Sequence, residues 1–137
     1  MGVFKDHAMS YFNAGLPVIP IGKDKKSIVP WKQFQKAKPT KKIMLSWIEK
    51  YPDANIAIIT GAVSGIAVVD IDTDQGLENI VKYLPDDPAL LRTFTPRGGQ
   101  HWFYNLPEGG MQCNVGAIKD CDLRADGGYV LVPPSRS

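Results

Sequence analysis

The segment Gly65–Asp72 constrains the fold of this chain most, because an apolar run ends there in two aspartates one residue apart. Side chains of a β-strand alternate between faces, so Asp70 and Asp72 should project together to one side. Two carboxylates at the end of a buried strand repel each other unless a cation or water lies between them. Oxygen-only ligands suit Mg²⁺ or Mn²⁺ rather than zinc. The segment therefore predicts a divalent metal site. The alternative is a solvated strand end that leads into a helix cap at Thr73 or Asp74.

The composition is that of one globular domain, with 137 residues of which 44% are apolar. The formal net charge of +2 neither requires nor excludes a nucleic-acid partner. The positive charge is uneven, because eight lysines fall within residues 23–42. Such a stretch is more often a solvated face than a binding site, and contact with a phosphate backbone is the alternative.

The two cysteines, Cys113 and Cys121, lie in no CxxC pair and in no cluster with zinc-ligand spacing. We expect both to be free thiols in a reducing compartment. No apolar run is long enough to cross a membrane, and Lys5 and Asp6 interrupt any stretch that resembles a signal peptide. We therefore expect a soluble, cytoplasmic protein with no membrane partner.

Apolar spacing predicts three helices, separated by short strands and a polar loop over residues 22–39. The helices are expected over residues 4–12, 41–51 and 74–84, the second capped by Thr40 and the third closed by Pro85. The strands are expected over residues 17–21 at a sheet edge, then 55–61, 65–72, 92–95, 101–105, 122–124 and 129–132. This mixture predicts an α/β or α+β fold.

The segment Thr95–His101 is a second candidate site element, since paired glycines precede a strand that begins with a histidine. Gly98 and Gly99 allow a sharp turn and a close backbone approach, and their N–H groups could cradle a phosphate. Arg97 adds a cation, and His101 could donate a hydrogen bond to a phosphate oxygen. The alternative is a hairpin turn with a structural histidine.

A third element is Cys121–Arg124, where Asp122 and Arg124 share one face by alternation. A third carboxylate beside the first two would complete a site for two divalent ions, which lie about 3.5–4 Å apart in phosphoryl-transfer enzymes. Asp120 and Asp126 are rival candidates that spacing alone does not exclude. The alternative is an ordinary acidic turn before two glycines.

In this order the segments resemble the amino-terminal catalytic domain of bifunctional primase-polymerases, in the archaeo-eukaryotic primase superfamily. Such domains occur in plasmids, phages and mobile elements of bacteria and archaea. The resemblance runs from about Ala14 to Ser135 and rests on segments that match the family's motifs: Asp70-Ile71-Asp72, Gly98-Gly99-Gln100-His101, Asp122 to Tyr129, and Pro133-Pro134-Ser135. Arg97 is a departure, since the family usually has a hydroxyl residue there.

The resemblance implies the primase catalytic core, with an amino-terminal α/β module, a second module akin to the RNA-recognition fold, and the site between them. It also implies that the chain is one catalytic domain cut from a longer protein, which in larger relatives carries a helicase. The implied activity is template-dependent joining of dNTPs or NTPs to a primer or an initiating nucleotide, on single-stranded DNA.

The resemblance also assigns roles to residues. The carboxylates of Asp70, Asp72 and Asp122 would be catalytic and would hold Mg²⁺ or Mn²⁺. The residues implied in nucleotide binding are His101, Arg97, Gly98, Gly99, Arg124 and Ser135. Weaker candidates for template contact are Lys25, Lys26 and Lys32.

Two other functions are compatible with parts of the sequence. A metal-dependent glycosyltransferase also places a DxD motif after an apolar strand, but it gives no reason for the later histidine and Asp-x-Arg segments. The other alternative is a module without catalytic activity that binds nucleotides or single strands within a replication or defence assembly.

Overall fold

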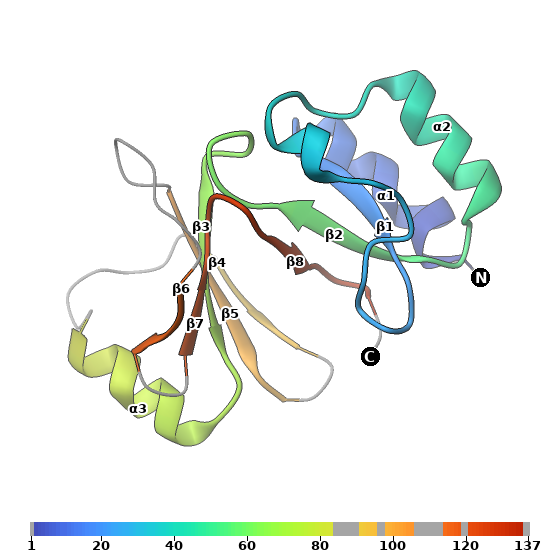
Figure 1. Ribbon diagram of the computed structural model, residues 1–137. Coiled ribbons are helices and arrows are strands. Elements are labelled where there is room, and N and C mark those ends of the chain that lie inside the picture. The colour runs from blue at the N-terminus through green and yellow to red at the C-terminus, as the bar shows by residue number, and fades with distance from the viewer. Residues whose placement is uncertain (1, 84–90, 96–97, 106–113, 119–120, 136–137) are drawn as a thin grey trace.

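The fold combines two antiparallel sheets with three α-helices among the described residues (Figure 1). The computed structural model describes residues 2–83, 91–95, 98–105, 114–118 and 121–135. The helices are α1 (Val3–Asn13), α2 (Lys41–Lys50) and α3 (Asp74–Tyr83), with a short 3₁₀ helix η1 (Lys32–Gln35). The strands are β1 (Val18–Ile21), β2 (Asn55–Ile59), β3 (Ile66–Ile71), β4 (Leu91–Phe94), β5 (Gln100–Asn105), β6 (Asn114–Ile118), β7 (Cys121–Arg124) and β8 (Tyr129–Leu131).

The first sheet has the order β1-β2-β8 and packs with α1 and α2 (Figure 1). Thr40 caps α2 as predicted, because its Oγ1 accepts a hydrogen bond from the Ile43 N–H at 3.3 Å. Phe4 of α1 and Met44 of α2 are fully buried in the core of this module. Strand β1 lies at the sheet edge, the position at which a sheet tolerates a proline such as Pro20.

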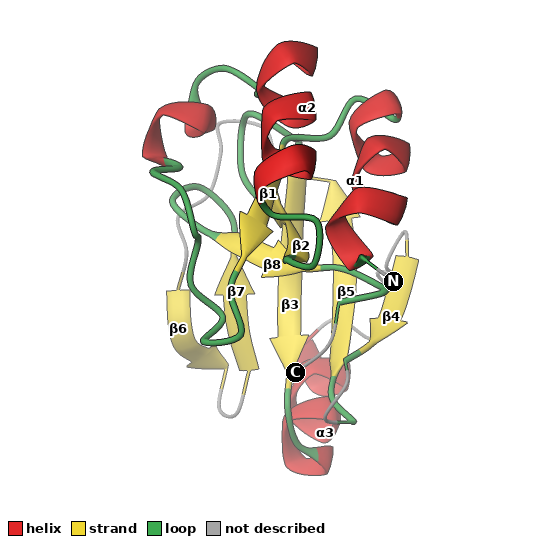
Figure 2. Cartoon of the chain, turned by 90° about the vertical axis from the view of Figure 1, so that its right-hand side faces the viewer, coloured by secondary structure: helices red, strands yellow, loops and turns green. Residues whose placement is uncertain are grey.

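The second sheet has the order β4-β5-β3-β7-β6, with β3 at its centre (Figure 2). Helix α3 covers one face, where its Ile80 packs against Val69 and Trp102 in a separate apolar cluster. Thr73 begins this helix, because its Oγ1 accepts a hydrogen bond from the Gly76 N–H at 3.0 Å. Of the two predicted N-cap residues, Thr73 and Asp74, Thr73 is therefore the one that caps α3.

The other face of the second sheet meets the first module only along part of its length. Val68 of β3 and Phe103 of β5 belong to the same core cluster as Ile58 and Val130 of the first sheet. Asp70 follows Val68 on this face of β3, since side chains alternate. The apolar contact between the sheets thus ends where the acidic part of β3 begins.

Most elements agree with the sequence, and the differences are local. The fold is α+β, because the six strand pairings within the described residues are all antiparallel. The sequence did not predict strand β6, and η1 lies inside the predicted loop. Pro85 and Cys113 lie outside the described residues, whereas Cys121 is a buried cysteine whose thiol donates to the Gly76 carbonyl oxygen at 3.2 Å. The likeness of the second sheet to the RNA-recognition fold stays a prediction.

None of the described helices combines the length and the apolar character needed to span a membrane.

Candidate active site

A row of polar side chains crosses the face of the second sheet that α3 leaves uncovered. Thr93 pairs with His101, His101 with Asp70, and Asp70 with Asp122, so four neighbouring strands each contribute one residue. Cross-strand partners point to the same face of a sheet. The pairing register therefore places His101 and Asp122 on opposite sides of Asp70.

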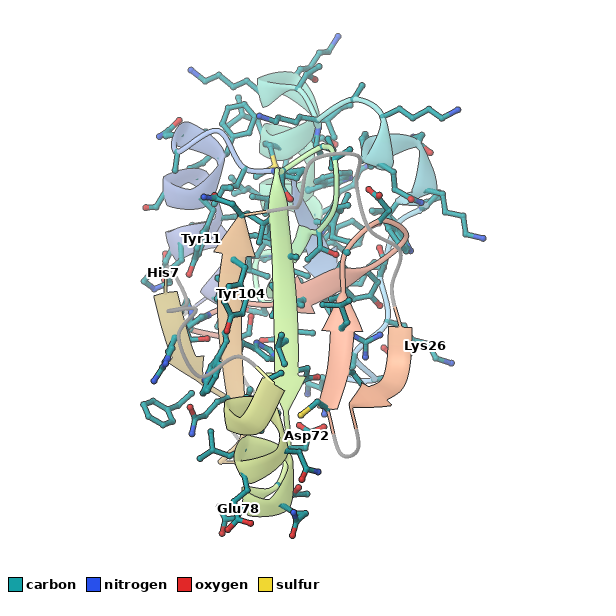
Figure 3. All side chains as sticks on the ribbon, turned by 90° about the vertical axis from the view of Figure 1, so that its left-hand side faces the viewer. His7, Tyr11, Lys26, Asp72, Glu78 and Tyr104 are labelled. Atoms are coloured by element: carbon teal, nitrogen blue, oxygen red, sulfur yellow. The ribbon has the colours of Figure 1, made fainter. Side chains whose placement is uncertain are left out.

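The carboxylates of Asp70, Asp72 and Asp122 form one acidic cluster. One oxygen from each lies within 4.8 Å of the others. Asp70 and Asp122 are half-buried, while Asp72 follows the last residue of β3 and is exposed. Figure 3 shows Asp72 at the end of β3, close to the start of α3. The structure thus brings together the three carboxylates that the sequence singled out.

The three carboxylates differ in their electrostatic environment. Burial would raise the pKa of Asp70, but attraction by His101 and Arg124 outweighs it and lowers this pKa below its usual value. Partial burial and repulsion by Asp70 and Asp122 raise the pKa of Asp72. The cluster therefore concentrates negative charge, which His101 and Arg124 offset at Asp70 but which remains unfavourable at Asp72.

His101 is buried against Asp70, with Nε2 3.3 Å from Oδ1 of the carboxylate. The two atoms do not have hydrogen-bond geometry, and Asp70 Oδ1 is a buried acceptor without a hydrogen-bond partner among the described residues. A buried carboxylate oxygen in this state is costly unless a cation or a donor approaches it. The donor set, three carboxylates with one unsatisfied oxygen, fits a divalent cation such as Mg²⁺ or Mn²⁺.

The turn between β4 and β5 differs from the predicted phosphate cradle. Gly98 N–H donates to the Thr95 carbonyl oxygen at 3.0 Å, and Gly99 N–H donates to Thr95 Oγ1 at 2.9 Å. Both glycine N–H groups are therefore used inside the turn. Gly99 instead provides close packing, since a Cβ there would lie 2.7 Å from the Ile71 carbonyl oxygen and 3.2 Å from Asp72 Oδ1. Arg97 lies outside the described residues.

Asp122, rather than Asp126, supplies the third carboxylate of the cluster. Asp126 points elsewhere, because its Oδ1 accepts a hydrogen bond from the Ala62 N–H at 2.8 Å and closes the turn after β2. Asp120 lies outside the described residues. Arg124 lies 3.8 Å from Asp122 Oδ2, and this partly exposed pair contributes little to stability.

A cavity of about 860 Å³ opens in front of the acidic cluster. It lies between the polar row of the second sheet and the segment from Gly127 to Ser135, which includes β8. Of the three predicted template lysines only Lys25 lines it; Lys26 and Lys32 are exposed elsewhere, and Figure 3 shows Lys26 at the flank, away from Asp72. Gly98 and Gly99 are not among its lining residues.

Ser135 lines the cavity, but its hydroxyl makes backbone hydrogen bonds. Its Oγ accepts from the Ile56 N–H at 2.8 Å and donates to the Ile56 carbonyl oxygen at 2.9 Å. These contacts hold the segment after β8 against the first sheet. They favour a structural position for Ser135, and its predicted role in nucleotide binding has no support from them.

Sequence reasoning missed Thr93, Trp31 and Tyr129 as lining residues of this cavity. Thr93 enters through the pairing of β4 with β5, which no local pattern reveals. Trp31 and Tyr129 lie in or next to segments that contain candidate residues. A single aromatic residue, however, has no local pattern that would predict a place in a binding site.

The sequence model of the family described as bifunctional DNA primase/polymerase, N-terminal, matches residues 8–137. The chain belongs to this family. It is therefore a nucleotidyltransferase domain of the primase/polymerase class, as the sequence motifs implied. No curated protein matches the chain significantly.

Proposed function

We propose that this primase/polymerase domain extends or initiates DNA strands by transferring nucleotidyl groups from dNTPs or NTPs, directed by a single-stranded DNA template. The observation that carries the proposal is the acidic cluster, three carboxylates within 4.8 Å on the open face of the sheet. Family membership supports the class of reaction. The glycosyltransferase alternative has no comparable support.

Asp70, Asp72 and Asp122 are the residues that would hold divalent ions. Mg²⁺ or Mn²⁺ bound there would increase the acidity of a primer 3′-hydroxyl and neutralise charge on the triphosphate and the leaving pyrophosphate. Asp70 is fixed at the centre of the site by its neighbours on β5 and β7, whereas Asp72 is free to adjust because it follows the strand.

His101 would serve the site in two ways. Its ring lies beside Asp70 and restrains that carboxylate, and it lines the cavity into which a triphosphate would extend. Arg124, on the other flank, would balance the charge of Asp122 or of a bound phosphate. Gly99 would act indirectly by leaving room for Asp72 beside the turn.

Primer extension on a defined template, with Mg²⁺, with Mn²⁺ and with chelator, tests this proposal. Wild-type protein should extend the primer only with metal, and Asp70→Asn and Asp122→Asn should abolish extension. Asp53→Asn removes the same charge from an exposed position outside the cluster and should retain activity. A wild-type protein that binds single strands but never incorporates nucleotides would instead favour the module without catalysis.

The resemblance carries further expectations that stay predictions. They are a longer parent protein with a helicase, a cytoplasmic setting and an origin in a mobile element.

A further inference from the structure

We propose that Trp31, Tyr129 and Lys25 form a binding subsite for one nucleotide of the single-stranded template, with a base stacked on the aromatic pair and a phosphate on the lysine. This inference rests on the proposed function. All three residues line the cavity that also contains the acidic cluster. They come from the first module and from β8, whereas the carboxylates come from the second sheet.

The aromatic pair is packed against the core and incompletely covered. The rings of Trp31 and Tyr129 meet edge to face, with centroids 5.1 Å apart and planes at 86°. Both side chains are half-buried and pack against the apolar core of the first module. Each side chain therefore packs against the core with one part and faces the cavity with another. Aromatic side chains of this kind are stacking platforms for bases in proteins that bind single strands.

Lys25 is held beside the pair by its backbone. The Tyr129 hydroxyl donates to the Lys25 carbonyl oxygen at 2.9 Å, and Lys25 has a positive φ of 65°. Because this contact uses the carbonyl, the exposed ammonium group is left to other partners. It makes no ion pair with any residue that the structure describes. A fixed backbone with an uncommitted ammonium group next to two rings suits a nucleotide, which has both a π-face and a phosphate.

Charge favours the template strand over the incoming nucleotide as the occupant. The metal-binding carboxylates would already take the triphosphate of an incoming nucleotide at the polar row. The subsite lies at the start of the lysine-rich segment, where further exposed lysines suit a continuous phosphate backbone. Stacking is also tolerant of sequence, as a template site must be. The volume of about 860 Å³ lies near the upper end for ligand cavities, which leaves room beyond a metal-bound triphosphate.

Tryptophan fluorescence gives a direct test, because the three tryptophans differ in burial. Trp47 and Trp102 are buried, at 8% and 3% exposure, and only Trp31 is half-buried. Titration of the wild-type protein with a short oligothymidylate, without metal or dNTP, should quench the emission. Trp31→Phe should remove most of this quenching while it preserves a ring for stacking. An unchanged emission at saturating oligothymidylate would overturn the proposal.

Affinity measurements then separate the two ligands. By fluorescence anisotropy, Trp31→Ala should weaken binding of labelled oligothymidylate about 5- to 150-fold, which corresponds to about 1–3 kcal/mol for one stacked base. Its affinity for dATP with Mn²⁺, measured by calorimetry, should be unchanged. A loss of dATP affinity with unchanged DNA affinity would assign the rings to the incoming base and refute the template subsite.

Lys25→Gln tests the phosphate contact, with Lys50→Gln as the matched control at an exposed position at the end of α2, outside the lysine-rich segment. The first variant should reduce the slope of log affinity for oligothymidylate against log salt by about 0.7, the value for one phosphate contact with a single strand. The control should leave the slope as it is. Equal slopes for Lys25→Gln and wild type would refute the contact.

Two outcomes would distinguish a failure of this subsite from a failure of the proposed function. Quenching without any primer extension by wild-type protein would support the subsite and refute the polymerase activity. Extension by a Trp31→Ala variant with wild-type affinity for DNA would do the reverse. If Trp31→Ala does not fold, the quenching of the wild type and its loss in Trp31→Phe decide the question.

Discussion

Neutralising the two neighbouring aspartates of β3 should have opposite effects on stability, although both substitutions should abolish activity. The surroundings of Asp70 lower its pKa, so its carboxylate stabilises the folded state at neutral pH. The pKa of Asp72 is raised, so its carboxylate destabilises the folded state. Asp72→Asn should therefore increase the free energy of unfolding, and Asp70→Asn should decrease it.

The size of the effect at Asp72 follows from the spacing of the cluster. Two unit charges 4.8 Å apart repel by about 0.9 kcal/mol in a medium as polar as water, and Asp72 has two such neighbours. Because Asp72 is exposed, salt screens part of this repulsion, and a gain of about 1 kcal/mol is expected. Asp70→Asn removes the anion beside His101, whose Nε2 lies 3.3 Å from Oδ1, and a loss of about 1 kcal/mol is expected from that spacing.

The dependence of stability on pH should also differ between the two carboxylates. The stability that Asp70 contributes is present above the unfolded carboxyl pKa of about 3.9 and is lost as the pH falls through its lower folded pKa. The penalty from Asp72 is absent below about 3.9 and develops as the pH rises through its higher folded pKa. The advantage of Asp72→Asn over wild type should therefore vanish in acid and reach its full size near neutral pH.

Urea denaturation of the metal-free proteins, at neutral pH and in acid, measures these differences. Asp53→Asn controls for the loss of one surface charge. Added Mg²⁺ should stabilise the wild type and have less effect on either site variant. If both substitutions shifted stability in the same direction by the same amount, the electrostatic asymmetry between the two carboxylates would be refuted.

Four other substitutions test three separate parts of the site. Gly99→Ala should reduce primer extension, because the added Cβ would crowd Asp72. The Cβ of Gly98→Ala would meet open space, so this variant should keep its activity. It should lose only about 1–2 kcal/mol of stability, because alanine is strained at the positive φ of 87° that Gly98 adopts. Extension at equal rates by both variants in the folded state would contradict this. Ser135→Ala should cost about 1–3 kcal/mol in urea denaturation and leave dNTP affinity unchanged, since its hydroxyl is bonded to Ile56; weaker dNTP binding at unchanged stability would restore its predicted role. His101→Ala should weaken dNTP binding by about 1.5–3 kcal/mol in calorimetric titrations, and unchanged affinity would reduce His101 to a packing residue.

Local patterns in the sequence predicted what depends on local physics. The spacing of Phe4 and Ala8 predicts the first helix, and Thr40 predicts where the second helix begins. Both helices are present, as α1 and α2. The alternation of Asp70 and Asp72 predicts that they share a face, and they lie in one cluster. Each of these predictions needs only a few consecutive residues.

Features that depend on distant partners were not predictable in this way. Strand β6 (Asn114–Ile118) contains a glycine and lies at a sheet edge, so its pairing with β7 rather than its own sequence defines it. The hydroxyl of Ser135 meets a backbone 79 residues earlier. The Asp126 carboxylate accepts a hydrogen bond from the Ala62 N–H, 64 residues away, and lies outside the acidic cluster.

The register of the second sheet explains why the site residues converge. A slip of β5 by one residue would place Gln100 or Trp102 opposite Asp70 in place of His101. Such a slip is prevented from both faces, because Trp102 is buried in the cluster under α3 and Phe103 in the core shared with the first module. Apolar packing on two sides thus selects the register, and the register sets His101 beside Asp70. His101 therefore owes its position in the site to the burial of the two residues that follow it, Trp102 and Phe103.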